Sequence, residues 1–231
     1  MLPYWQLCSR ARENSAVNRR LLESAGAEIG LQISDQQSKA FELLLHELLR
    51  WNKRINLTAI TSPDEMTVKH LIDSLHLVPH LRHGEHLLDI GSGAGFPALV
   101  LAVMRPDCFV SSIDAVGKKV SFQRHIARLL KLDNLQPLHG RAEELAIKQP
   151  GSFDLVASRA FSSLILFAEL AAPLVCQGGR IISMRSSGGA NEAEQDREQL
   201  HALKLLTESV VNYGLPMQMG GRSLVILRKG P

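Results

Sequence analysis

Three glycines follow an apolar run in the middle of the chain, and a carboxylate precedes them. Residues 86–95 read HLLDIGSGAG, so Asp89 lies two residues before Gly91, and Gly93 and Gly95 follow at alternate positions. Glycines after a strand let the backbone turn tightly and approach a ligand, toward which the next helix points its N-terminus. This loop predicts a nucleoside or nucleotide site.

The spacing of the loop distinguishes two kinds of ligand. The dinucleotide fingerprint GxGxxG would need glycine at position 96, where this chain has Phe96 followed by Pro97. A pyrophosphate requires free backbone amides and a small residue at that point. The observed GxGxG spacing, with Ser92 between the first two glycines, therefore favours S-adenosylmethionine, which has no phosphate.

Further polar residues follow the expected strands and complete this cofactor site. Asp89 is placed to meet the positively charged amino end of the cofactor, because a buried acid without a partner is costly. Asp114 ends the second expected strand, where a carboxylate can accept both ribose hydroxyls. The Ala142 amide and Glu143 follow the third strand and are expected to contact the adenine; the alternative is a helix N-terminus stabilised by acids. Together these features predict an S-adenosylmethionine-dependent methyltransferase.

The elements that must position these residues alternate between short apolar strands and helices, which is typical of a parallel sheet covered on both faces. We expect strands at 86–90, 109–114, 135–139, 153–158 and 180–184, helices at 96–104, 118–131, 162–175 and 192–207, and an antiparallel pair at 209–213 and 223–228. Helices are also expected from Ser34, capped with Gln37, and from Ser62, where Ser62 can cap and Glu65 can reach back.

This pattern predicts an α/β fold, a Rossmann-like class I methyltransferase with a mostly parallel seven-stranded sheet, an antiparallel C-terminal edge and an N-terminal helical segment. We divide the chain into an N-terminal arm and helical segment, residues 1–82, and an S-adenosylmethionine-binding methyltransferase domain, residues 83–231. A length of 231 residues suits one domain with an appendage.

Composition restricts the class of protein further. No apolar run approaches the length of a membrane span, and the N-terminus does not resemble a signal peptide. Cys8, Cys108 and Cys176 are widely spaced without a CxxC pair, so we expect neither a metal site nor disulfides, and a cytoplasmic protein. A net charge of +3 is compatible with an RNA substrate.

Several segments resemble the ribosomal RNA small subunit methyltransferase G family, also called glucose-inhibited division protein B. They are WNKRINLT at 51–58, HLIDSL at 70–75, the glycine loop with Phe96 and Pro97, and SRAF at 158–161, in the order seen in that family. The resemblance covers residues 31–229. It implies methylation of N7 of a guanine in the decoding-region loop of 16S ribosomal RNA, with naked RNA or the 30S subunit as substrate. We expect a monomer.

The resemblance also implies roles for single residues. Gly91 and Phe96 would line the cofactor site, Ala142 and Glu143 the adenine pocket, and Arg159 the mouth of the site. Two positions depart from the family pattern: Ala98 stands where the family usually has glycine, and Arg185 lies in a segment where it often has Leu-Lys-Gly. Because arginine and lysine differ in hydrogen-bond geometry, an RNA contact at Arg185 would differ too.

Guanine N7 carries an in-plane lone pair and no proton, so its methylation needs alignment and no catalytic base. Accordingly, Ser158-Arg159-Ala160 replaces the Asn/Asp-Pro-Pro-aromatic segment used on exocyclic amines, and the Pro-Cys or Thr-Cys nucleophile of carbon methylation is absent. Arg159 is the expected catalytic residue, orienting the cofactor carboxylate, or the guanine O6 and a phosphate; the alternative is a surface arginine paired with an acid.

Other interpretations of these residues stay open. HLIDSL is better explained by helix-capping or interhelix hydrogen bonds than by a His-Asp-Ser triad. A dinucleotide-dependent oxidoreductase is disfavoured by the glycine count, and a non-catalytic RNA-binding module would not need a complete cofactor pocket. A methyltransferase for a small molecule or a protein is opposed only by the segments 51–58 and 70–75. RNA contacts are hypothesised from clustered charge at Lys53, Arg54, Lys118, Lys119, Arg124 and Arg128.

Overall fold

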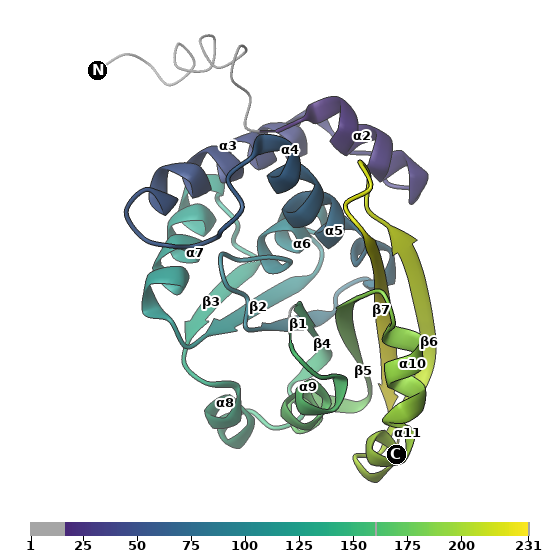
Figure 1. The fold of residues 1–231 in the computed structure, drawn as a ribbon. Coiled ribbons are helices and arrows are strands. Elements are labelled where there is room, and N and C mark those ends of the chain that lie inside the picture. The colour runs from purple at the N-terminus through teal and green to yellow at the C-terminus, as the bar shows by residue number, and fades with distance from the viewer. Residues whose placement is uncertain (1–16, 160, 231) are drawn as a thin grey trace, which may run out of the picture.

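A seven-stranded sheet forms the centre of the molecule, with strand order β3-β2-β1-β4-β5-β7-β6 (Figure 1). The computed structural model describes residues 17–159 and 161–230, so Cys8 and the first 16 residues of the N-terminal arm lie outside the described residues. The strands are β1 His86–Ile90, β2 Phe109–Asp114, β3 Leu135–His139, β4 Phe153–Arg159, β5 Val175–Ser186, β6 Leu205–Gly214 and β7 Gly221–Lys229. Strands β1 to β5 pair in parallel and β7 pairs antiparallel with β5 and β6, which confirms the expected fold.

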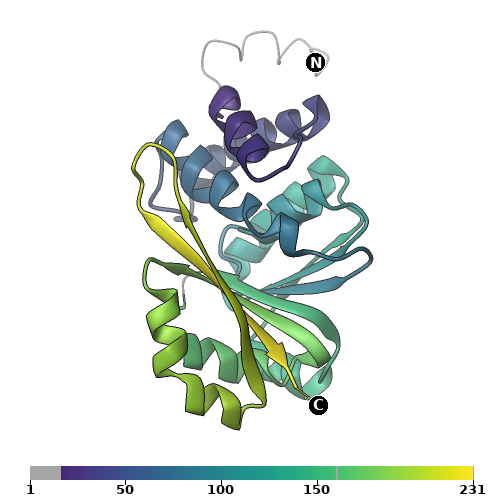
Figure 2. The same ribbon diagram turned by 90° about the vertical axis from the view of Figure 1, so that its right-hand side faces the viewer.

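Helices cover both faces of this sheet, as Figure 2 shows from the side. Neighbouring side chains of a strand point to opposite faces, so Leu87 and Leu88 of β1 belong to two separate apolar clusters. The first cluster lies under α3 Asp35–Asn52, α6 Ala98–Met104 and α7 Gly117–Leu130. The second lies under α8 Ala142–Lys148, α9 Leu164–Ala171, α10 Gly189–Gln195 and α11 Arg197–Ala202.

The N-terminal helices pack on the first of these faces. They are α2 Arg19–Glu28, α3, α4 Pro63–Met66, the π-helical segment η2 Thr67–Ile72, α5 Asp73–Leu75 and the 3-10 turn η3 Val78–His80. Phe41 of α3 shares the first cluster with Leu99 of α6 and Phe122 of α7. The helical segment is thus held against the sheet by common apolar contacts, and the division of the chain at residue 83 stays a prediction.

Both expected helix starts are confirmed, but only one has the expected capping contacts. The amide of Gln37 donates to Ser34 Oγ at 3.2 Å and the Ser34 amide donates to Gln37 Oε1 at 2.9 Å, which confirms the capping box. The second helix begins at Pro63 with Ser62 at the N-cap, but the side chain of Ser62 makes no capping hydrogen bond. Glu65 pairs instead with Lys69 at 2.6 Å, so the expected side-chain contacts of Ser62 and Glu65 are wrong.

The side chain of Asn52 holds the loop after α3 through three hydrogen bonds to its backbone. Asn52 Oδ1 accepts from the amides of Leu57 and Thr58 at 2.7 and 3.1 Å, and its Nδ2 donates to the Thr58 carbonyl at 2.8 Å. Trp51 beside it packs in the core, 5.6 Å from the ring of Phe122. The WNKRINLT segment therefore orders the junction between α3 and the helices that carry HLIDSL.

Two expected helices differ most from the structure. The helix expected at 192–207 is two helices, α10 and α11, which end at Gln195 and Ala202, and Leu205 instead begins β6 by pairing with Lys229 of β7. The helix expected at 162–175 is α9, which ends at Ala171, and β5 already begins at Val175. Both corrections lengthen strands, because pairing across the sheet outweighs the local helical pattern. No helix among the described residues is long and apolar enough to cross a membrane.

Candidate functional site

The glycine loop lies at the carboxyl end of β1, between β1 and α6. Gly91, Gly93 and Gly95 have φ of 69°, 59° and 93°, a region that side chains other than glycine rarely adopt. The amides of Gly91 and Ser92 donate to the carbonyl of Ile113 at 2.9 and 3.2 Å, which fastens the loop to β2. The loop is thus built to present backbone at the edge of the sheet where α/β folds bind ligands.

A buried glutamine supports this loop from behind, and sequence reasoning missed it. Gln123 of α7 donates through Nε2 to Ser92 Oγ and to the Gly93 carbonyl, both at 2.8 Å, and its Oε1 accepts from Ser112 Oγ at 2.6 Å. The expected role of Ser92 as a loop residue therefore includes an internal bond to α7. A polar residue on the apolar face of an amphipathic helix was the available sequence signal.

Asp89 lies beneath the loop and is fully buried. Its Oδ2 accepts from the Ala98 amide at 3.3 Å, whereas its Oδ1 has no hydrogen-bond partner among the described residues. Burial raises the pKa of this carboxyl to about 7, against the opposing effects of the Ala98 amide and the charge of Arg159. An unpartnered buried carboxylate oxygen is costly, and an ammonium group is the partner that would satisfy it.

Asp114 binds the loop and its own strand end at the same time. Its Oδ2 accepts from the Gly93 amide at 2.9 Å and its Oδ1 from the Val116 amide at 2.8 Å, while Lys119 Nζ lies 3.9 Å from Oδ2. A carboxylate has about four acceptor positions, so both oxygens can still accept a hydroxyl. This geometry is compatible with the expected ribose contact.

The loops after β2 and β3 lie side by side next to the glycine loop. The Gly140 amide donates to the Asp114 carbonyl at 3.2 Å, and His139 Nε2 lies 3.2 Å from the Ala115 carbonyl. Ala142 is buried at the start of α8, and Glu143 beside it is exposed. The expected adenine contacts thus begin at the same edge of the sheet as Asp114.

Phe96 connects the loop to the N-terminal helices. Its ring is buried and stacks on His70 of η2, with 4.5 Å between ring centroids and an interplanar angle of 9°. The guanidinium carbon of Arg159 lies 5.7 Å from the centroid of the same ring. Ala98, where the family usually has glycine, is fully buried and supplies the amide bonded to Asp89.

The HLIDSL segment forms a hydrogen-bond network and no triad. Ser74 Oγ donates to the His70 carbonyl at 2.6 Å and so turns away from the imidazole. Burial, together with the charge of Arg159, lowers the pKa of His70 to about 3. Arginine can only donate, so His70 Nδ1 accepts from Arg159 at 3.3 Å and Nε2 donates to Thr58 Oγ1 at 3.1 Å.

Arg159 ends β4 and joins the sheet to this network. Its NH1 donates to the Lys69 carbonyl at 2.5 Å and lies 3.6 Å from Asp73 Oδ2. About a fifth of its side chain is exposed, at 22%. Arg159 is therefore a partly buried bridge between β4 and η2 that still faces a cavity, and Ala160 after it lies outside the described residues.

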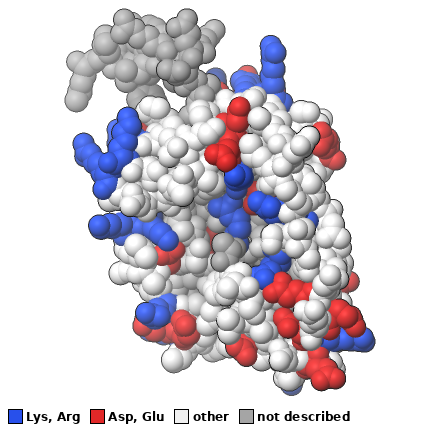
Figure 3. Space-filling view, in the orientation of Figure 1, with Lys and Arg blue, Asp and Glu red and all other residues white. Residues whose placement is uncertain are grey.

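That cavity has a volume of about 430 Å³ and lies between the helical segment and the carboxyl ends of β4 and β5. Its polar lining is mainly cationic, and Figure 3 shows basic side chains gathered in the middle of this face. The lining residues are Ile60, Lys69, His70, Asp73, Arg159, Phe161, Ser162, Met184, Arg185, Ser186 and Arg222. Lys69, Asp73 and Arg222 are site residues that the glycine loop did not reveal.

Arg185, the second departure from the family pattern, is held inside the protein. It donates from Nε and NH2 to the two oxygens of Glu192, at 2.9 and 2.5 Å, and from NH1 to the Phe161 carbonyl at 2.6 Å. These bonds fix the segment after β4 to α10. Arg185 thus shapes the wall of the cavity and has little donor capacity left for RNA.

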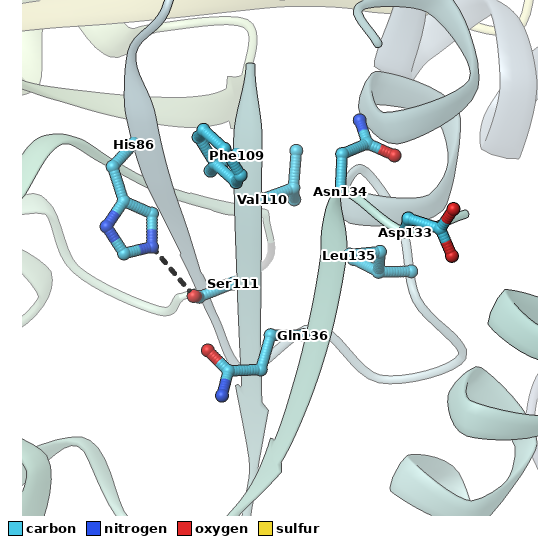
Figure 4. A pocket seen from close by; sticks show the side chains of 8 residues that line it. All are labelled: His86, Phe109, Val110, Ser111, Asp133, Asn134, Leu135 and Gln136. Carbon is cyan, nitrogen blue, oxygen red and sulfur yellow. Dashed lines mark hydrogen bonds between the residues drawn. The ribbon is translucent and has the colours of Figure 1, made fainter. Parts of the chain in front are cut away.

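A second cavity of about 510 Å³ lies at the opposite end of the strands. Residues at the start of β1, β2 and β3 line it, among them His86, Phe109 and Leu135, as Figure 4 shows. His86 Nε2 lies 2.9 Å from Ser111 Oγ. This cavity is remote from the glycine loop, so it is not the expected site.

In the described part of the chain, no cluster of three or more His, Cys, Asp or Glu side chains could hold a metal ion.

Comparisons with known proteins identify the family of this chain. Residues 37–219 match the model of a family described as rRNA small subunit methyltransferase G. The chain is 43% identical over 207 residues to the ribosomal RNA small subunit methyltransferase G of Geobacter metallireducens, covering 90% of this chain and 94% of that protein.

Solved structures share the fold at low sequence identity. A SAM-dependent methyltransferase from Aquifex aeolicus superposes with a TM-score of 0.55 and 18% identity, covering 72% of this chain and 93% of that chain. M. jannaschii TYW2 in complex with AdoMet gives a TM-score of 0.54 and 14% identity, covering 68% and 73%.

Proposed function

Because the chain belongs to the rRNA small subunit methyltransferase G family, we propose that it transfers a methyl group from S-adenosylmethionine to N7 of a guanine in 16S ribosomal RNA. The observation that carries the proposal is Asp89, whose buried Oδ1 lacks a partner among the described residues beneath a loop of three glycines. S-adenosylmethionine has an ammonium group that fits this oxygen, and its sulfonium supplies an electrophilic methyl group when bound.

The residues of the sheet edge would hold the cofactor in the following way. Asp89 would pair with the amino end, and both oxygens of Asp114 would accept the ribose hydroxyls. Ala142 and Glu143 would flank the adenine. Backbone of the glycine loop would approach the nucleoside and the amino-acid tail at Gly91, Ser92, Gly93, Gly95 and Phe96.

The cavity beside the loop would receive the target guanine. Arg159, Lys69 and Arg222 line it and suit a negatively charged nucleotide. His70 is neutral at physiological pH because its pKa is about 3. Its imidazole therefore stacks on the ring of Phe96 and accepts a hydrogen bond from Arg159. Catalysis would then come from alignment of N7 with the methyl group, with Arg159 fixing the guanine O6, a phosphate or the cofactor carboxylate.

The described cysteines support this chemistry. Cys108 Sγ lies 3.1 Å from the Arg82 carbonyl and Cys176 Sγ lies 3.8 Å from Asp154 Oδ1. Neither residue lines the cavity. A covalent route through a thiol, as carbon methylation of a pyrimidine requires, therefore has no nucleophile among the described residues of this cavity.

We also propose the form of the substrate, the oligomeric state and the location of the enzyme. The substrate is 16S ribosomal RNA, naked or within the 30S subunit, and the enzyme acts as a cytoplasmic monomer. The exposed face of α7 carries Lys118, Arg124 and Arg128, which would add phosphate contacts beside the site.

Methyl transfer from labelled S-adenosylmethionine to 30S subunits, naked 16S RNA and total protein tests the proposal. We expect label in 16S RNA, in one or both RNA-containing substrates. Label in protein or in a small molecule alone would instead support the alternative, a methyltransferase for those substrates. Binding of S-adenosylhomocysteine without binding of NAD separates both from an oxidoreductase.

A further inference from the structure

A tyrosine of the C-terminal hairpin reaches the acidic residue at the wall of the cavity. The hydroxyl of Tyr213, in β6, donates to Asp73 Oδ1 at 2.8 Å, across 140 residues of sequence. The ring of Tyr213 stacks on His76, with 3.7 Å between centroids. Burial and the neighbouring Asp73 raise the pKa of the phenol, so it remains a neutral donor at physiological pH.

Asp73 has two arginines near it, but its short bond goes to the tyrosine. Arg159 NH1 lies 3.6 Å from Oδ2 and Arg222 Nε lies 3.9 Å from Oδ1, both longer than a direct hydrogen bond. Asp73 is only 4% exposed. The buried carboxylate of Asp73 therefore balances the charges of Arg159 and Arg222 without a direct hydrogen bond to either. Its Oδ1 is occupied by the neutral hydroxyl of Tyr213.

The two arginines keep donors for a ligand. Arg222 donates one hydrogen bond among the described residues, from NH1 to the Gly221 carbonyl at 2.9 Å. Arg159 donates to Lys69 and His70, and both arginines line the cavity. A guanidinium has five N–H donors, so each can still bind a phosphate oxygen.

The strand register delivers the tyrosine and one arginine together. Tyr213 and Arg222 are direct partners in the antiparallel pair of β6 and β7, and Arg222 in turn pairs with Ser186 of β5. Cross-strand partners lie close enough to act on one group. The hairpin therefore brings a cation and a competing donor to the same carboxylate.

Loss of the hydroxyl would change this balance. Asp73 Oδ1 would become an unpartnered buried oxygen, and the nearest donors are on Arg222 and Arg159. Charge-assisted bonds between a guanidinium and a carboxylate are short and strong, so the arginines would move onto Asp73. Those donors would then no longer be available to a ligand in the cavity.

We propose that Tyr213 is a positioning residue for RNA binding: it occupies Asp73 so that Arg159 and Arg222 stay directed toward the phosphodiester backbone of the target nucleotide. This inference rests on the proposed function, because it needs an RNA in the cavity. It assigns the C-terminal hairpin, remote from the glycine loop in sequence, to the substrate side of the site.

The test is the Tyr213→Phe variant, which keeps the ring on His76 and removes only the hydroxyl. Steady-state methyl transfer to 30S subunits should show the KM for the subunits raised about tenfold, since a hydrogen bond to a charged group is at stake. The kcat at saturating subunits should change less than about twofold. The Kd for S-adenosylhomocysteine should equal that of the wild type, and Val211→Ala, two residues earlier on β6, should leave both constants unchanged.

A second variant separates positioning from a structural effect. In Tyr213→Phe/Asp73→Asn the amide no longer attracts the arginines, so the KM should fall back toward the wild-type value. A KM for 30S subunits that is unchanged in Tyr213→Phe, or that rises further in the double variant, would overturn this inference alone. A wild-type protein that leaves RNA unmethylated would overturn the proposed function and this inference with it.

Discussion

Asp89 Oδ1 is the only buried carboxylate oxygen without a hydrogen-bond partner in the described ranges. The carboxyl has a pKa of about 7, raised by burial, so Asp89 titrates near neutral pH when no ligand is bound. A cationic amine binds the ionised form. Proton binding and cofactor binding therefore compete at this residue.

This competition predicts a pH dependence of cofactor affinity. The Kd for S-adenosylhomocysteine should stay level above pH ~7 and rise by up to about tenfold per pH unit below it. Calorimetric titrations between pH ~5.5 and ~7.5 measure it. Asp89→Asn should bind roughly 10–100-fold more weakly and show no such slope, because a neutral amide replaces the carboxylate. A level wild-type profile, or the same slope in Asp89→Asn, would contradict the role of Asp89.

Arg159 joins the sheet, the helical segment and the cavity, so its removal should affect turnover more than folding. Arg159→Ala is expected to fold normally, by circular dichroism, and to lose roughly 100-fold in kcat/KM for 30S subunits. Arg159→Lys should lie between the two, since lysine keeps the charge but lacks the planar fork of donors. Turnover near the wild-type value in Arg159→Ala would refute this role.

The cysteines should be dispensable for methyl transfer. Replacement of Cys8, Cys108 and Cys176 by alanine should retain activity, because N7 of guanine attacks without help from a thiol. The measurement is labelled methyl transfer to 16S RNA by the triple variant, alongside its circular dichroism spectrum. A folded triple variant that no longer transfers methyl groups would defeat the N7 assignment.

At the scale of elements, a buried ion pair holds β5 to the segment before β1. Arg180 NH2 lies 2.6 Å from Glu85 Oε1, both side chains are almost fully buried, and Arg180 NH1 donates to the His80 carbonyl at 2.8 Å. Glu85→Ala would leave the guanidinium buried without its counterion. The free energy of unfolding should fall by about 3–5 kcal/mol.

Urea denaturation measures this decrease, and the chain offers a matched control. Arg197 and Glu194 form an ion pair that is more than 70% exposed on both sides. Glu194→Ala should change the free energy of unfolding by less than about 1 kcal/mol, because exposed pairs are weak. Equal effects of the two substitutions would show that Glu85 does not act through the buried pair.

Elements whose residues face one environment could be predicted well from the sequence. The three strands β1, β2 and β3 have the expected bounds, because short apolar runs between turns leave little choice. The first part of β6 could not be predicted, since Leu205 to Thr207 continue a helical pattern and become a strand only through pairing with β7. The π-helical turn at Thr67–Ile72 likewise has no signal in the residue types.

The residues of the candidate site likewise divide into those that the sequence predicts and those that it does not. Asp89 and Asp114 lie at the carboxyl ends of β1 and β2, and the glycines follow β1 directly, so their meeting at one edge is a consequence of parallel pairing. Gln123, Tyr213 and Arg222 reach the site from α7 and the C-terminal hairpin. Their positions depend on packing and register between distant segments, which local patterns do not contain.

At the scale of the whole molecule, the cofactor and the RNA would bind between the sheet edge and the helical segment. In the proposed function, the loops after β1, β2 and β3 would form the cofactor side, and η2, the ends of β4 and β5, and β7 would form the substrate side. Phe96 on His70, and Arg159 on Lys69, connect the two sides. We therefore propose that residues 17–82 act as the wall of the substrate site.

RNA binding by the wider surface should depend on salt. Neutralising Lys118 and Lys119 at the start of α7 should flatten the plot of log affinity for 16S RNA against log salt by about one to two units of slope, about one for each phosphate that the protein no longer neutralises. Filter binding at several salt concentrations measures it. The control Lys148→Gln, on α8, should leave the slope unchanged; an equal flattening there would assign the effect to net charge.

The identity of the methylated atom decides whether this protein is a guanine-N7 methyltransferase. After reaction of wild-type protein with 30S subunits or naked 16S RNA, the RNA is digested to nucleosides and analysed by mass spectrometry, and the modified position is mapped. We expect 7-methylguanosine at a single site in the decoding-region loop, and much less of it with Asp89→Asn when the cofactor is limiting. Methyl groups on another atom, on another RNA or only on protein would contradict the account.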